Sequence, residues 1–179
     1  MIKYGKDIVN KIGRIRKLLS EADFDVVSDA LHEIGKLNLK ELEGDIRAFL
    51  SHSDPELQQA AIMVLGTYWG LPDFRDELFG IFSDVIDDDV RFSALINWVG
   101  YFRGMKDVSV FKVLLNIAQD GSEDMFVRAA AVRGIYMVSN AGVDETVMNS
   151  LMHAPSYKEF ESLIPWPRID EILKDAGLN

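Results

Sequence analysis

The sequence contains no cysteine among its 179 residues. This absence excludes disulfide bonds, thiolate metal ligands and cysteine nucleophiles. Long hydrophobic runs are missing too, because no stretch approaches the roughly 20 apolar residues of a membrane span. The first residues also lack the apolar run of a signal peptide. We therefore expect a cytoplasmic protein that does not have a membrane as its partner.

Positive charge is scarce beyond the first residues. The net charge is −10, yet residues 1–17 hold six cations against one carboxylate, which leaves −15 on the rest of the chain. An acidic surface repels phosphate backbones and attracts basic surfaces. The composition therefore disfavours nucleic acid and favours a basic protein as partner, although acidity also serves solubility alone.

The residue sets that support catalysis are missing as well. The histidines His32, His52 and His153 lie in different segments and do not have the spacing of metal ligands. The sequence has no phosphate-binding glycine loop and no nucleophile elbow. The run Asp87-Asp88-Asp89 lacks the remaining positions of a calcium loop. We expect no enzyme activity, no metal site and no cofactor.

What the sequence does contain is an internal repeat of four segments. Apolar residues at offsets 0, 4, 5, 8 and 11 form a stripe along one side of an α-helix. Offset 4 is alanine in each copy, which lets a neighbouring helix approach closely. The stripe consists of Val26, Ala30, Leu31, Ile34 and Leu37; Leu57, Ala61, Ile62, Leu65 and Tyr68; Val90, Ala94, Leu95, Trp98 and Tyr101; and Val127, Ala131, Val132, Ile135 and Val138.

Signals for the helix ends repeat with the stripe. Aspartate or serine precedes each copy and can accept hydrogen bonds from the first helical turn, and glycines follow the second, third and fourth copies. Companion segments at about 39–51, 73–84, 107–119 and 144–153 lie between the marked helices. The copies are 31, 33 and 37 residues apart, which is the length that a helix pair with two turns needs. The pattern predicts an all-α fold of stacked helix pairs.

The two ends of the chain are expected to cover the stack, so that residues 1–179 form one domain. Residues 1–19 are predicted to form a capping helix that places Ile8, Val9, Ile12, Ile15, Leu18 and Leu19 on its covered face. The alternative is a basic arm for an acidic partner or a membrane surface. The repeats occupy residues 20–153.

Residues 154–179 are predicted to form a C-terminal cap. Pro165 and Pro167 prevent a continuous helix, so short helices are expected at about 157–163 and 168–176. Trp166 is predicted to be an apolar plug over the fourth copy, and a partner-binding tryptophan is the alternative.

Residues 54–61, 88–94 and 124–131 resemble the second helix of HEAT repeats, in which an aspartate turn is followed by Val-Arg and small residues. Val90-Arg91 and Val127-Arg128 match this pattern, whereas the second copy has Leu57-Gln58 and the first has Val26-Val27. The resemblance covers about residues 20–153. It implies a right-handed α-α superhelix, a HEAT-like solenoid of about four helix pairs with capping helices, that serves as a non-enzymatic protein-binding module.

In HEAT-type stacks the second helix of each pair lines the concave side, so offsets 2, 6 and 9 are predicted to face a partner. Phe92, Ile96 and Val99 make the third copy apolar there, which marks either an interface or a face covered by the C-terminal helices. Acidic residues at the turns, most of them also caps, are expected to form a ridge. The predicted partner-binding residues are His32, Gln59, Met63, Phe92, Ile96, Arg133 and Tyr136 in the groove and Asp84, Asp87, Asp88 and Asp89 on the ridge.

The most concrete function that we predict is an acidic inhibitor or immunity protein that neutralises a basic partner such as a nuclease toxin. A general scaffold or adaptor remains an alternative. A tetrapyrrole-handling or other ligand-binding protein is a further one, although Trp69, Trp98, Tyr101 and Tyr136 are more simply explained as core. The salt dependence of binding distinguishes the inhibitor from the scaffold. Ions screen the acidic ridge but not an apolar groove.

Overall fold

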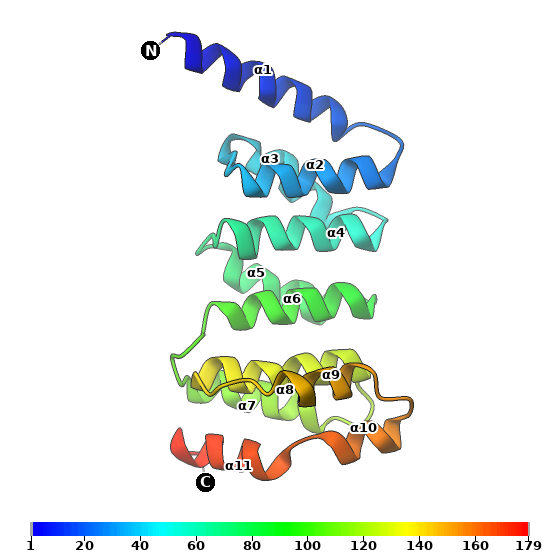
Figure 1. Cartoon of the computed structure of the whole chain (residues 1–179), viewed down its shortest axis with the longest axis vertical. Coiled ribbons are helices and arrows are strands. Elements are labelled where there is room, and N and C mark those ends of the chain that lie inside the picture. The colour runs from blue at the N-terminus through cyan, green and yellow to red at the C-terminus, as the bar shows by residue number, and fades with distance from the viewer. Residues whose placement is uncertain (1, 179) are drawn as a thin grey trace. The chain divides into compact units, whose positions relative to one another are not determined.

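The computed structural model describes the backbone of residues 2–178 and the side chains of residues 10–178, so the predicted burial of Ile8 and Val9 lies outside the described residues. Its helices confirm the all-α fold (Figure 1). None of the described helices is long and apolar enough to cross a membrane. The helices are α1 (Ile2–Leu18), α2 (Phe24–Lys36), α3 (Glu43–Arg47), α4 (Pro55–Ile62), α5 (Phe74–Asp84), α6 (Asp88–Gly100), α7 (Val108–Gln119), α8 (Met125–Ser139), α9 (Glu145–Met152), α10 (Tyr157–Leu163) and α11 (Trp166–Asp175).

The predicted companion segments are helical as well. Residues 73–84, 107–119 and 144–153 contain α5, α7 and α9, and residues 39–51 contain the short α3 between two 3₁₀ turns. The chain divides into two compact units, of which the first ends at Arg75 and the second begins at Asp76. Each unit is described by itself.

Aspartate side chains begin the helices, as the sequence predicts. In each case a carboxylate oxygen accepts hydrogen bonds from backbone N–H groups of the first turn, an arrangement that stabilises a helix by about 1 kcal/mol. These caps are Asp23 of α2, Asp54 of α4, Asp87 of α6, Asp107 of α7, Asp124 of α8 and Asp144 of α9. Much of the acidity at the turns therefore helps to fold the chain.

In the first unit, α1 covers the repeat helices. Ile15 is fully buried and Ile12 is half-buried, which agrees with a capping helix. The basic side chains of α1 form ion pairs inside the unit: Lys11 with Glu33 at 3.3 Å and Arg16 with Asp45 at 3.0 Å.

The repeat stripe of the first unit is buried at offsets 4, 5 and 8, whereas Val26 at offset 0 is half-buried and the last position is exposed. The prediction for offset 11 is wrong here, because Leu37 is 42% exposed and Tyr68 is 37% exposed. Leu37 lies beyond the last residue of α2 as its C-cap. Tyr68 belongs to a π-helical segment, Met63–Tyr68, which continues α4.

The π-helical segment changes which side chains face the core. The Trp69 N–H donates to the carbonyl of Val64, five residues back, at 3.0 Å. The wider turn adds one residue to the helix, so Trp69, 7% exposed, takes the buried position expected for Tyr68. Tyr68 packs edge-on against His32 instead, with ring centroids 6.2 Å apart. Gly35 makes room for this ring, since a Cβ there would lie 2.4 Å from the Tyr68 ring.

In the second unit, α8 is the central helix and packs against α6, α7, α9 and α11 (Figure 1). From Val127 to Val138 every residue except Arg133 is buried, which confirms the predicted stripe of the fourth copy. Tyr101, at offset 11 of the third copy, is half-buried.

The C-terminal segment differs from its prediction in one respect. The chain breaks between α10 and α11 as expected, but α11 begins at Trp166, so Pro167 lies inside the first turn. Proline is tolerated there because the first N–H groups of a helix have no acceptor within it. Trp166 is only half-buried, and the fully buried Phe160 and Ile169 provide the apolar cover.

Candidate protein-binding site

Two neighbouring turns of the second unit carry a concentration of carboxylates. Asp84, Asp88 and Asp89 are exposed between α5 and the first turn of α6, while the Asp87 carboxylate accepts the Val90 N–H at 3.0 Å. The α7–α8 turn adds three more acidic residues. We call these residues the acidic edge, which consists of Asp84, Asp87, Asp88, Asp89, Asp120, Glu123 and Asp124.

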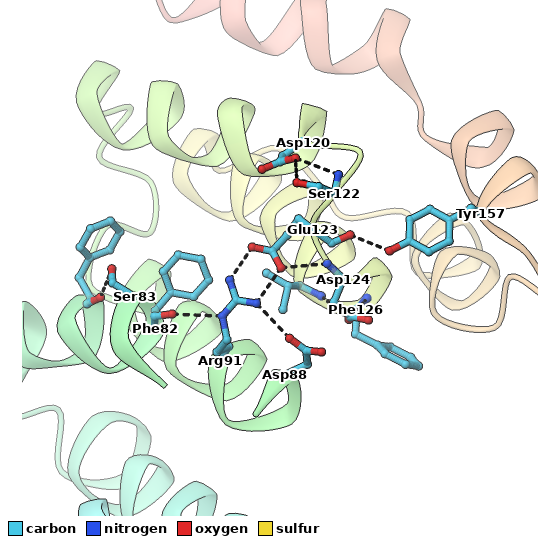
Figure 2. Close-up of polar contacts among 12 residues, drawn as sticks. Phe82, Ser83, Asp88, Arg91, Asp120, Ser122, Glu123, Asp124, Phe126 and Tyr157 are labelled. Carbon is cyan, nitrogen blue, oxygen red and sulfur yellow. Dashed lines mark hydrogen bonds and ion pairs between the residues drawn. The ribbon is translucent and has the colours of Figure 1, made fainter. Parts of the chain in front are cut away.

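Arg91 of α6 joins the two turns of the acidic edge (Figure 2). Its Nη1 donates to Glu123 at 2.7 Å and to Asp88 at 3.0 Å. Its Nε donates to the carbonyl of Phe82 at 3.2 Å, and the guanidinium lies over the Phe82 ring. The Val-Arg motif therefore fixes the spacing of carboxylates from different helix pairs.

The α7–α8 turn is held by its own hydrogen bonds (Figure 2). Asp120 accepts from the Ser122 hydroxyl at 2.6 Å and from its N–H at 2.9 Å. The Tyr157 hydroxyl of α10 donates to the carbonyl of Glu123 at 2.8 Å. Glu123 belongs to the acidic ridge that the sequence predicts at the turns, but it was not among the residues predicted to bind the partner; its contact with Arg91 is what adds it to the site.

These contacts lower the pKa of two carboxylates in the α7–α8 turn, Glu123 and Asp120. The hydrogen bond from Arg91 lowers the pKa of Glu123 below its ordinary value, although partial burial opposes the shift. Hydrogen bonds from Ser122 lower the pKa of Asp120. Glu123 and Asp120 therefore stay ionised to a lower pH than an ordinary carboxylate.

The Glu123–Arg91 pair predicts a pH dependence of stability. The pKa of Glu123 is lowered by folding, so its contribution is present above the ordinary value of 4.5 and is lost as the pH falls below it. We expect wild type to be more stable than Glu123→Gln at pH 7, and the difference to shrink below about pH 4.5. Urea unfolding of both proteins across this range measures the effect. A difference that stays constant with pH would contradict it.

A pocket of about 150 Å³ opens between α6, α8 and α9. Phe92 and Ile96 line it from α6, and Met148 and Met152 line it from α9. Because α8 packs against both helices, its buried small residues, Ala129 and Ala130, form the floor, and Arg133 also lines the pocket. The structure thus brings together Phe92, Ile96 and Arg133, three of the predicted groove residues.

The methionines of α9 were missed by the sequence predictions. The companion segment 144–153 is apolar at both positions, but its spacing does not say which helix it faces. Methionine adapts its shape to varied apolar neighbours, so this side of the pocket can adjust to what enters.

Other predicted groove residues do not face an open groove. Tyr136 is 3% exposed and burial raises its pKa, and Val99 is fully buried. Arg133 forms two hydrogen bonds with Glu145 of α9, each of 3.1 Å, and is not an unpaired cation. The expectation that Tyr136 faces a partner is wrong because α9 and α11 pack against α8. In the fourth copy, therefore, the C-terminal helices cover the side of α8 that was expected to face a partner.

The remaining predicted residues belong to the first unit. His32 is half-buried against Tyr68, and Gln59 of α4 is half-buried. Met63 is exposed at the start of the π-helical segment.

Comparison with known proteins finds one family model that matches part of the chain. The sequence profile of the family described as HEAT repeats matches residues 13–98, which run from α1 into α6. No curated protein and no solved structure matches the chain.

Proposed function

We propose that this HEAT-like helical repeat protein binds a basic protein through its acidic edge. HEAT repeats are typical of protein-interaction scaffolds rather than enzymes. The observation that carries the proposal is the charge of the edge: seven carboxylates lie at two turns, and Arg91 is the cation that pairs with two of them. Negative charge therefore remains on Asp84 and Asp89 at the surface.

Such a surface acts mainly on the encounter between two proteins. Complementary charge steers a basic partner toward the edge and raises the association rate, and salt weakens the effect by screening. The turns are preorganised by the contacts of Arg91 and Tyr157, so little ordering is needed when the partner arrives.

Within this class, the specific role that we propose is inhibition of a cationic enzyme such as a nuclease toxin. A nuclease needs a positive surface to bind phosphates. A row of fixed carboxylates can occupy that surface and exclude the nucleic acid, without any catalytic group on the inhibitor.

The test uses a charge-matched pair of variants. Asp84→Asn/Asp89→Asn removes two exposed charges from the edge and leaves the helix cap at Asp87 and the Arg91 pairs intact. Asp29→Asn/Glu41→Gln removes two exposed charges from the first unit. Each variant is used to capture a basic partner, in low salt, from the cells that produce the protein. We expect the edge variant to retain at least tenfold less of this partner than wild type does. The control should retain as much as wild type.

The partner should have a high isoelectric point and should elute as salt approaches about 1 M, where charges are screened beyond about 3 Å. If the captured partner is acidic, or if both variants bind equally well, the proposal fails. The role as an inhibitor is tested separately, by asking whether the captured partner cleaves nucleic acid and whether this protein stops it.

A further inference from the structure

The pocket between α6, α8 and α9 has a size that specifies what can enter it. Its volume is about 150 Å³, and six of its seven lining residues are apolar. A protein cavity of about this volume with apolar walls stays dry and accepts benzene. The pocket therefore fits one phenylalanine, leucine or methionine side chain, and it is too small for a tetrapyrrole.

The surroundings of the pocket specify what flanks that side chain. Asp89 precedes Phe92 by three residues and Ile96 by seven, so these residues share one face of α6. On α8, Phe126 has the same spacing to Ala129 and Arg133. It is 42% exposed, two residues after the Asp124 cap (Figure 2). Exposed apolar surface thus leads from the acidic edge into the pocket.

The opposite end of the pocket is electrically neutral. Arg133 and Glu145 neutralise each other through their paired hydrogen bonds. A ligand therefore meets the negative charge of Asp89 and the acidic edge on the other side of the pocket.

We infer that the pocket takes one benzene-sized apolar side chain of a partner protein, and that Lys or Arg residues flanking this side chain face the acidic edge. The inference rests on the proposed function, because it names the part of the basic partner that is recognised. The apolar anchor provides affinity that salt does not screen, and the flanking cations provide orientation.

The pocket itself is tested with toluene as probe, followed by NMR of methyl-labelled methionines. We expect saturable shifts of the Met148 and Met152 methyl signals, with Met105, which is 66% exposed in the α6–α7 loop, as the unaffected control. Ala129→Leu places a larger side chain on the pocket floor and should abolish the shifts. Toluene that shifts neither Met148 nor Met152 would overturn the inference, and it would leave the proposed function standing.

The partner motif is tested by selecting random dodecapeptides on phage against the whole protein. We expect enriched peptides to share one Phe, Leu or Met flanked by Lys or Arg, and to bind Ala129→Leu at least tenfold less tightly. Met152→Ala enlarges the pocket from a half-buried position and should shift the preferred anchor toward tryptophan, whereas Met105→Ala should not. This second variant keeps the test valid if Ala129→Leu folds poorly.

The outcomes separate the two proposals. Basic peptides without a shared apolar residue, or with equal affinity for Ala129→Leu, overturn the pocket inference and support the acidic edge alone. Anchored peptides without Lys or Arg overturn the predicted flanks and count against the basic partner. A selection that enriches no peptide over the Ala129→Leu background overturns the inference.

Discussion

Replacing Arg128 with alanine is expected to lower the free energy of unfolding by about 3–5 kcal/mol, the range for breaking a buried charged contact and leaving a cavity. Arg128 is 1% exposed. Its Nε and Nη2 donate to the carbonyl of Ala118, near the end of α7, at 3.0 and 2.8 Å. The same guanidinium forms an ion pair with Glu161 and lies over the Phe160 ring of α10. One side chain thus connects α7, α8 and α10.

Two further variants separate the causes of this loss. Arg128→Met fills much of the same volume but leaves the Ala118 carbonyl without its donor, so it should cost about 1–3 kcal/mol, the penalty for an unsatisfied buried group. Arg133→Ala removes an arginine whose pair with Glu145 is largely exposed, and it should change stability by less than about 1 kcal/mol. Urea unfolding followed by circular dichroism measures all three. An Arg128→Ala protein as stable as Arg133→Ala would show that the buried contacts contribute little.

Gly134→Val is expected to destabilise the protein by about 3 kcal/mol, at the upper end for overfilling a packed core. Gly134 lies on α8 at a point where side chains of α6 and α7 lie close to its backbone. A Cβ at this position would meet Val99 Cγ2 at 3.0 Å and both Leu114 methyl groups at 3.1 Å. Valine adds two further carbons, so α6 and α7 must move apart or α8 must shift.

The matched control is Gly80→Val in α5, where a Cβ meets nothing within 4 Å. Valine forms helix slightly better than glycine, so this variant should unfold within about 0.5 kcal/mol of wild type. Thermal and urea unfolding of both variants test the prediction. Equal losses at the two positions would mean that the cost comes from valine in a helix rather than from packing against Val99 and Leu114.

The helices could be predicted from the sequence because their signals are local. Aspartates such as Asp54 and Asp124 act on the N–H groups of the next turn, so their effect needs no knowledge of the rest of the fold. The stripe at offsets 0, 4, 8 and 11 requires only regular helical geometry. It failed at Tyr68 because the π-helical segment breaks that regularity, and no residue of the repeat pattern signals the change.

The candidate site was predictable only in part. Phe92, Ile96 and the acidic residues of the turns follow from their place in the repeat. The pocket also needs Met148 and Met152, which are distant in the sequence and reach α8 only through tertiary packing. The burial of Tyr136 likewise depends on helices that follow the repeats.

The two Val-Arg motifs show which properties the sequence determines and which depend on the tertiary structure. By itself the sequence determined that Arg91 and Arg128 occupy the same position in equivalent helices. In the structure each donates to a carbonyl near the end of the preceding helix, Phe82 of α5 and Ala118 of α7. Only the tertiary structure decided that Arg91 stays partly exposed and binds Glu123, whereas Arg128 is fully buried against Phe160. The physical reason is that helical periodicity and capping act within a few residues, while burial depends on which distant segment packs against the helix.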